Sequence, residues 1–273
     1  MKEPAHDLKS PLMQGAIGIF DSGVGGLTVL TALRERLPNQ DYLYLGDTAR
    51  LPYGSKSETT IRRYALKAAE HLFRHDIRLL VVACNTASAF ALPALVKISP
   101  VPVLGVVEPG VRTALAGGAR KVAIIGTEGT IRSGAYQKAL HRAAPGVKVT
   151  AAPCPLFVPL AEEGWGDHPI TDQVAEIYLR PLLDKGLEAI ILGCTHYPLL
   201  RPSLARVAGP GVSLIDSATA VTDAVIQRYR GPTSSTKGVG RVVIHLTDAS
   251  DRFRRIARAI LGSDPQNLEV VDL

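Results

Sequence analysis

Two segments of this sequence place a cysteine at the end of an apolar run, just before small polar residues. In the first segment, Cys84 directly follows the apolar run 79–83. It precedes Asn85 and Thr86, and a helix is predicted to begin at Ala87. A thiol at the start of a helix has a lowered pKa and stays accessible to a ligand. A buried structural thiol is the usual alternative, and this segment alone does not decide between the two.

The second segment repeats this arrangement and adds a histidine. Cys194 follows the apolar run 189–192 and one glycine, and it precedes Thr195 and His196. A histidine beside a thiol can hold it as a thiolate or exchange a proton with it. Two thiols on opposite sides of one carbon can remove a proton from one face and return a proton to the other. We therefore interpret the two cysteines as the acid and base of a racemase.

The remaining cysteine and the histidines do not suggest a metal site. Cys154 lies between Pro153 and Pro155 without polar neighbours, and we expect it to pack in the interior. Three cysteines cannot form a closed set of disulfides, and no pair has the spacing typical of zinc ligands. We expect neither a metal nor a cofactor.

A glycine-rich turn, DSGVGG at 21–26, follows a predicted strand and opens a helix. Its backbone amides could hold an anion at the start of that helix. A dinucleotide fingerprint is an alternative, but its third glycine would fall on Thr28. The acid that reads the ribose would have to be Asp41 or Asp47, and neither fits well. A nucleotide-binding oxidoreductase therefore remains the weaker interpretation.

Charge and hydropathy limit the remaining classes of protein. The chain has 273 residues and a net charge of +6, and its positive charges are spread over amphipathic segments. No basic stripe carries interleaved aromatics, so a nucleic-acid partner is not favoured. The longest apolar runs are far shorter than the roughly 20 residues of a membrane span, and 1–16 reads as a polar tail. We expect a cytoplasmic protein without a membrane partner.

Short apolar runs alternate with longer stretches of helical periodicity along the chain. This pattern predicts an open, mostly parallel α/β fold. The predicted strands are 17–20, 42–45, 79–83, 103–107, 122–125, 189–192 and 242–246. The predicted helices are 26–36, 57–75, 133–143, 170–185 and 249–260, and 231–240 is predicted to be a surface loop.

The two halves of the chain echo each other weakly. The strand and glycine-rich turn at 17–27 resemble the layout of 122–134, and both cysteine segments follow strands. We expect two similar α/β domains with the active site in the cleft between them, because sites of open α/β sheets lie at the carboxyl ends of strands. The first domain would comprise 1–108 plus 212–273, and the second 109–211.

Two further segments could contribute to such a site. Residues 51–55 form a loop rich in proline and glycine that could reach over a cleft, although an ordinary surface turn is equally consistent with its composition. Glu162 and Glu163 could be nothing more than a charged helix end.

Several segments taken together, in order, resemble the glutamate racemase family. The match extends from Ile19 to about Ala220 and is far more specific than any one of its pieces. The segments are IFDSGVGGLTVL, GDTARLPYGSKS, ACNTASA, GVVEPG, IGTEGTIRSGAY, FVPLAEEG and LGCTHYPLL.

This resemblance implies two α/β domains and catalysis without pyridoxal phosphate or metal. Cys84 would take the α-proton of D-glutamate, and Cys194 that of L-glutamate. Asp21 and His196 would assist these thiols, and Glu162 is a further helper suggested by a short match. The substrate contacts that the resemblance implies are Asp21, Ser22, Tyr53, Gly54, Asn85, Thr86, Thr195 and His196.

The resemblance also bears on specificity, physiology and partners. Aspartate racemases share the two cysteines but carry Glu at the position of His196, so glutamate is favoured over aspartate as the substrate. The implied physiological function is supply of D-glutamate for peptidoglycan. A homodimer is expected, and DNA gyrase, which some relatives bind, is kept as a second kind of partner.

Overall fold

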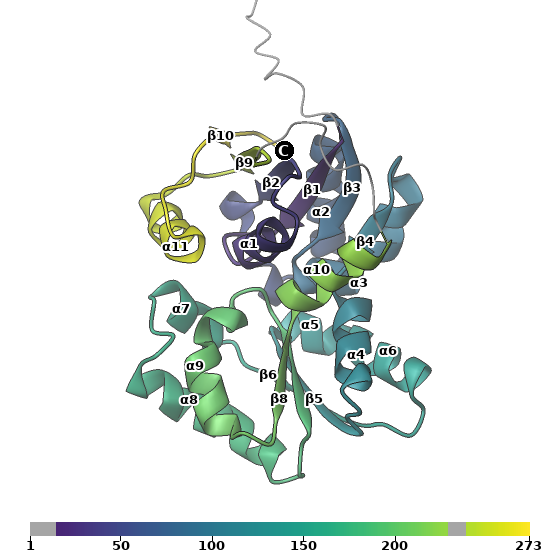
Figure 1. Cartoon of the computed structure of the whole chain (residues 1–273), viewed down its shortest axis with the longest axis vertical. Coiled ribbons are helices and arrows are strands. Elements are labelled where there is room, and N and C mark those ends of the chain that lie inside the picture. Colours follow the sequence, from purple (N-terminus) through teal and green to yellow (C-terminus); the bar gives the residue numbers. More distant parts are fainter. Residues whose placement is uncertain (1–14, 229–238) are drawn as a thin grey trace, which may run out of the picture.

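The computed structural model describes residues 15–228 and 239–273 and contains two parallel β-sheets (Figure 1). The six-stranded sheet has the order β10 (Leu268–Val270), β9 (Val242–Leu246), β2 (Tyr42–Gly46), β1 (Ala16–Asp21), β3 (Ile77–Val82) and β4 (Val103–Gly105). The four-stranded sheet has the order β6 (Lys148–Pro153), β5 (Lys121–Gly126), β7 (Ala189–Gly193) and β8 (Ser213–Asp216). All the strand pairs are parallel.

Helices connect the strands and cover both faces of each sheet. They are α1 (Leu27–Arg36), α2 (Glu58–Leu72), α3 (Asn85–Ile98), α4 (Val107–Ala116), α5 (Glu128–Ser133), α6 (Ala135–Ala143), α7 (Phe157–Glu162), α8 (Pro169–Leu183), α9 (Arg201–Ala208), α10 (Ser217–Arg228) and α11 (Asp251–Leu261). Three short 3-10 helices, η1 (Thr48–Arg50), η2 (Tyr53–Ser55) and η3 (Tyr197–Leu200), lie in connecting loops.

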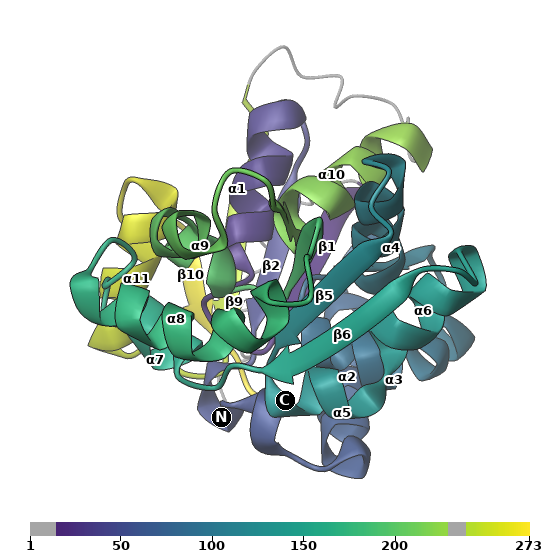
Figure 2. The ribbon, with the colours of Figure 1, turned by 90° about the horizontal axis from the view of Figure 1, so that it is seen from below.

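Each sheet separates two apolar cores, as expected when helices cover both faces of a parallel sheet. In the view of Figure 2, α8 and α9 lie on one side of the four-stranded sheet and α4 and α6 on the other. Helix α10 packs against α1 and α4, and so joins the two units. The predicted fold of two open, parallel α/β domains is therefore confirmed.

The division of the chain differs from the prediction at one point. The chain was predicted to return to the first domain at residue 212, but β8 pairs with β7, with Leu214 opposite Ile190. This short strand therefore belongs to the four-stranded sheet, and the return begins with α10, whose Val221 and Val225 pack in the first unit's core.

Other differences are smaller. Strands β6, β8 and β10 were not predicted, and the strand predicted at 103–107 ends at Gly105 because α4 begins two residues later. The predicted tail and the predicted loop 231–240 lie largely outside the described residues. Within the described ranges, no helix has the length and hydrophobicity needed to cross a bilayer.

The core beneath α1 gives a test of this packing. Leu30 is fully buried on α1, so we expect Leu30→Ala to lower the free energy of unfolding by about 2–5 kcal/mol through lost contacts and a residual cavity. Ile177, on α8, is 71% exposed, so Ile177→Ala serves as the control, with an expected change below about 0.5 kcal/mol. Urea unfolding followed by circular dichroism measures both, and equal midpoints would contradict the described packing.

Candidate active site

A cavity of about 400 Å³ lies where the two sheets meet. Strands β1 and β3 of the first sheet and β5 and β7 of the second end beside it, because residues that directly follow these strands line its wall. The predicted residues that line it are Ser22, Tyr53, Gly54, Cys84, Asn85, Thr86, Glu162, Cys194, Thr195 and His196. Both predicted catalytic cysteines therefore face one cavity.

Cys84 caps the beginning of α3. Its sulfur accepts a hydrogen bond from the amide of Ala87 at 3.4 Å, and its thiol contacts Oγ of Ser22 at 3.5 Å. Burial, and then the negative charge of Asp21, raise the pKa of Cys84 to about 12. The lowered pKa that was expected from the helix start is wrong, because desolvation of the buried thiolate outweighs the amide contact. This environment favours the protonated thiol of Cys84 at neutral pH.

Cys194 has a different environment, dominated by a buried histidine. Its sulfur lies 3.8 Å from Nδ1 of His196. On the other side of the ring, Nε2 of His196 lies 3.2 Å from Oε1 of Glu162, within ion-pair distance but outside hydrogen-bond geometry. Burial alone would lower the pKa of His196, but Cys194, Glu162 and the charge of Asp21 together raise it to about 10. A protonated imidazolium therefore stands beside this thiol.

Glu162 is itself anchored from the far end of the chain. Its Oε2 lies 2.9 Å from Nη2 of Arg252, which belongs to α11 and also lines the cavity. Burial favours the neutral form of Glu162, but His196 and Arg252 lower its pKa below the ordinary value. The arrangement Cys194, His196, Glu162 and Arg252 is thus a continuous set of polar contacts that favours a charged histidine.

Asp21 lies beneath the cavity and does not line it. Its Oδ2 accepts hydrogen bonds from the amides of Gly23 and Gly26, each at 3.0 Å, and Oδ1 accepts one from the hydroxyl of Thr195 at 3.4 Å. The predicted anion cradle is therefore occupied, in part, by the turn's own carboxylate. Burial raises the pKa of Asp21, although His196 and these amides oppose the shift.

The glycines of this turn have a packing function. A Cβ atom at Gly25 would lie 2.5 Å from Oγ1 of Thr195 and 2.6 Å from Nδ1 of His196. A Cβ atom at Gly26 would lie 2.4 Å from Cβ of Asp21. These close approaches account for both glycines without a bound nucleotide, and they bring the turn directly against the second cysteine segment.

Polar groups that follow Cys84 hold the opposite wall. Oδ1 of Asn85 accepts hydrogen bonds from the hydroxyls of Tyr136 at 2.6 Å and Ser217 at 3.1 Å. Its Nδ2 is buried and has no hydrogen-bond partner among the described residues. A buried amide donor without a partner is costly, so this group is suited to a ligand that brings an acceptor.

Three threonine hydroxyls meet at Thr86, the residue that follows Asn85 in the chain. Oγ1 of Thr86 is 2.9 Å from that of Thr127 and 3.1 Å from that of Thr130, and the last two are 3.0 Å apart. Thr127 caps α5 in the second unit and lines the cavity, so these contacts cross between the units. Thr127 was not among the predicted site residues, although its glycine-rich segment echoes the turn that contains Asp21.

The loop 51–55 also reaches the cavity, which the alternative of an ordinary surface turn does not explain. Tyr53 is buried, and its hydroxyl donates to Oδ2 of Asp47 at 2.6 Å. A Cβ atom at Gly54 would lie 2.6 Å from Cβ of Thr127, so this glycine allows η2 to contact the second unit. Arg252 also lines the cavity but was not predicted as a site residue, since its sequence neighbours do not reveal that α11 reaches Glu162.

Comparison with known proteins identifies the family. The sequence profile described as Asp/Glu/Hydantoin racemase matches residues 27–225. The chain belongs to this racemase family. A glutamate racemase from Geobacter metallireducens is 49% identical over 253 residues, which cover 90% of this chain and 93% of the relative.

Solved racemase structures agree with this assignment. The structure of glutamate racemase from Francisella tularensis in complex with D-glutamate is 36% identical and has a TM-score of 0.87, covering 96% of this chain and 98% of that one. Glutamate racemase from Thermus thermophilus, in complex with beta-chloro-D-alanine, is 45% identical with a TM-score of 0.85 and the same coverage. These likenesses extend over both α/β units of the racemase described above.

The raised pKa of Cys84 can be tested by alkylation. Iodoacetamide reacts with the thiolate, so the alkylation rate at this residue should rise about tenfold per pH unit from roughly pH 7 to pH 10, without levelling off near about 8.5 as an ordinary thiol does. Mass spectrometry of the peptide that contains Cys84 measures the rate, with N-acetylcysteine as the reference. A plateau near the ordinary thiol pKa would contradict the described environment.

Proposed function

We propose that this racemase interconverts L- and D-glutamate without a cofactor, using Cys84 and Cys194 as its two acid–base groups. The observation that carries the proposal is that both thiols line one small cavity and have contrasting surroundings. The identity to curated glutamate racemases supports glutamate as the substrate.

The proposed reaction requires one thiolate and one thiol in every turnover. With D-glutamate bound, the thiolate of Cys84 takes the α-proton and the thiol of Cys194 returns a proton to the opposite face. With L-glutamate bound, the two exchange these functions. The raised pKa of Cys84 favours its function as the proton donor of the second direction, and the imidazolium beside Cys194 favours a negative charge there.

The proposed substrate contacts follow from the groups around the thiols. The unpartnered amide of Asn85 and the hydroxyls of Thr86 and Thr127 are donors suited to a carboxylate. Ser22, Tyr53, Gly54, Thr195 and His196 complete the proposed contact surface. Donors fixed in a buried site stabilise the negative charge that develops when the α-proton leaves.

We further propose that Asp21, His196 and Glu162 position the two thiols and influence their protonation. Asp21 hydrogen-bonds Thr195, and His196 contacts both Cys194 and Glu162. The physiological function proposed is the supply of D-glutamate for peptidoglycan in the cytoplasm. The homodimer and a DNA gyrase interaction stay predictions from the family resemblance.

Substrate choice tests the proposed function directly. We expect glutamate to be racemised at least about tenfold faster than aspartate, since one methylene in a fitted pocket is worth roughly 10–200-fold in rate. Circular dichroism of purified protein with each enantiomer of both amino acids measures these rates. Equal turnover of aspartate would contradict the proposed specificity for glutamate. Dependence on added pyridoxal phosphate would contradict the proposed catalysis without a cofactor.

Single cysteine variants test whether both thiols are needed, one as proton acceptor and the other as proton donor. Cys84→Ala and Cys194→Ala should each lose racemisation in both directions, because every turnover needs a proton acceptor and a proton donor. Cys154→Ala, in which a buried thiol outside the cavity is removed, is the control and should keep near-native activity.

Isotope exchange then tests which thiol acts on which face of the substrate's α-carbon. In deuterium oxide, the Cys194→Ala variant should slowly exchange the α-hydrogen of D-glutamate, and the Cys84→Ala variant that of L-glutamate, as followed by NMR. Near-native racemisation by either variant would show that its missing cysteine is not a base. Exchange without preference for an enantiomer would refute the assignment of the thiols to faces.

A further inference from the structure

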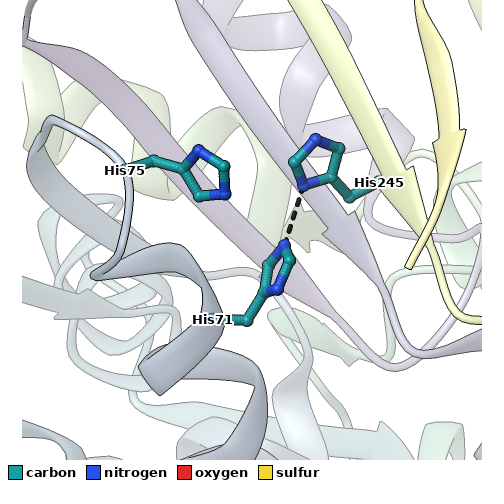
Figure 3. A group of neighbouring side chains, drawn as sticks. All are labelled: His71, His75 and His245. Carbon is teal, nitrogen blue, oxygen red and sulfur yellow. Dashed lines mark hydrogen bonds between the residues drawn. The ribbon is translucent and has the colours of Figure 1, made fainter. Parts of the chain in front are cut away.

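Two histidines at the end of α2 and one on the distant strand β9 meet in the first unit, outside the candidate active site. His71 lies in the last turn of α2, His75 follows just beyond its end, and His245 lies on β9 (Figure 3). One potential ligand nitrogen of each lies within 4.8 Å of the others. None of the three lines the cavity that contains the cysteines.

The spacing of the rings matches that of a three-histidine metal site. The ring centroids are 5.2 Å apart for His71 and His75, and 5.1 Å apart for each of the other two pairs. Around tetrahedral zinc, with bonds of about 2.0–2.1 Å to nitrogen and ring centres about 1.1 Å beyond, the centroids would be about 5.2 Å apart. The ring centres therefore already have the separations that a three-histidine zinc site needs.

The nitrogens of one pair must turn as well as separate. Nε2 of His71 lies 2.9 Å from Nδ1 of His245, where the two rings share a hydrogen bond. The centroids of these two rings are 5.1 Å apart, so the two nitrogens point almost directly at each other. Two nitrogens bound to the same tetrahedral zinc are about 3.4 Å apart on ring axes about 109° apart, so binding requires the pair to open by roughly 0.5 Å and each ring to turn by roughly 35°. The proton in this hydrogen bond would move to the other nitrogen of the donor ring, which leaves a lone pair for the metal.

The protonation of the cluster also suits a metal. Burial is the first cause that lowers the pKa of all three, and the neighbouring histidines add to it for His71 and His245, each of which falls to about 4. Glu269 opposes the shift at His75, and Arg74 reinforces it. Neutral imidazole is the form that binds a metal, so at neutral pH no proton has to be displaced from a charged ring.

A carboxylate lies where it can orient one of the rings. Oε2 of Glu269, on β10, lies 3.4 Å from Nε2 of His245. Metal-binding histidines commonly donate their other ring N–H to a carboxylate, which fixes the ring and raises its basicity. With its proton held on Nε2, His245 presents the lone pair of Nδ1 toward His71. His75 is exposed and gives an ion access from solvent.

We propose that His71, His75 and His245 bind a divalent transition metal ion, with Zn²⁺ as the ion that fits best. Three imidazoles would fill three positions, and the fourth would face solvent beside His75. The ion would link α2 to β9, and thereby fix the C-terminal segment that also carries Arg252. The proposed site is independent of the proposed racemase function.

The test uses untagged full-length protein stripped with a chelator. Because the active-site thiols also bind zinc, a Cys84→Ser/Cys194→Ser variant is the starting protein. Titration calorimetry with Zn²⁺ should show one site, and zinc at about 100 times its Kd should raise Tm by about 5 °C. His75→Ala changes an exposed ligand, and His141→Ala, an exposed histidine on α6, is its matched control.

We expect His75→Ala to weaken zinc binding by more than roughly 100-fold, since loss of even an orienting partner costs 10–100-fold. His141→Ala should bind as the starting protein does, and Glu269→Gln should weaken binding by about 10–100-fold. Unchanged binding in His75→Ala, or no binding by the starting protein, would overturn the site. Unchanged binding in Glu269→Gln would overturn the orienting contact.

Discussion

The buried carboxylate of Asp21 joins the parts of the candidate site that come from different units. It closes the glycine-rich turn through the amides of Gly23 and Gly26, and it accepts a hydrogen bond from Thr195 in the second unit. A buried carboxylate requires such partners, because an unpaired charge in the interior is strongly unfavourable. The close approach of Gly25 to His196 depends on the same turn. The position of the glycine-rich turn against the second cysteine segment thus depends on how one buried carboxylate is satisfied.

Thermodynamics limits what the different surroundings of the two thiols can do to the reaction. Two enantiomers have equal free energies in water, so an enzyme that interconverts them must have the same kcat/KM in both directions at every pH. The raised pKa of Cys84 and the imidazolium beside Cys194 therefore cannot favour one direction overall. In the proposed reaction these two features determine the protonation state of the thiols before substrate binds. They can therefore change kcat and KM individually while their ratio stays equal in the two directions.

Much of this architecture could be predicted from local sequence, because buried parallel strands leave continuous apolar runs. The central strands β1, β2, β5 and β7 were predicted nearly to their ends for this reason. Strand β8 was missed because it is short and only partly buried, so its residues Ser213–Asp216 do not form such a run. The segments that contain Cys84 and Cys194 were found because polar residues directly follow apolar strands.

What could not be predicted depends on contacts between distant residues. Nothing near Arg252 indicates that it reaches Glu162, and nothing near His245 indicates that α2 brings two more histidines beside it. The pKa of Cys84 was misjudged for the same reason, since the helix start is visible in the sequence but the depth of burial is not. Local patterns predict the elements, whereas electrostatics depends on the assembled molecule.

The three threonine hydroxyls carry a consequence for how a ligand enters. Each hydroxyl has one proton to donate, and Thr86, Thr127 and Thr130 lie in a closed triangle of hydrogen-bond distances. When each donates to the next around the triangle, all three protons are used within it. An arriving carboxylate can gain a donor only if one of these bonds breaks and that hydroxyl rotates toward it. The triangle thus holds three hydrogen-bond donors between the two units and gives one up only to a strong acceptor.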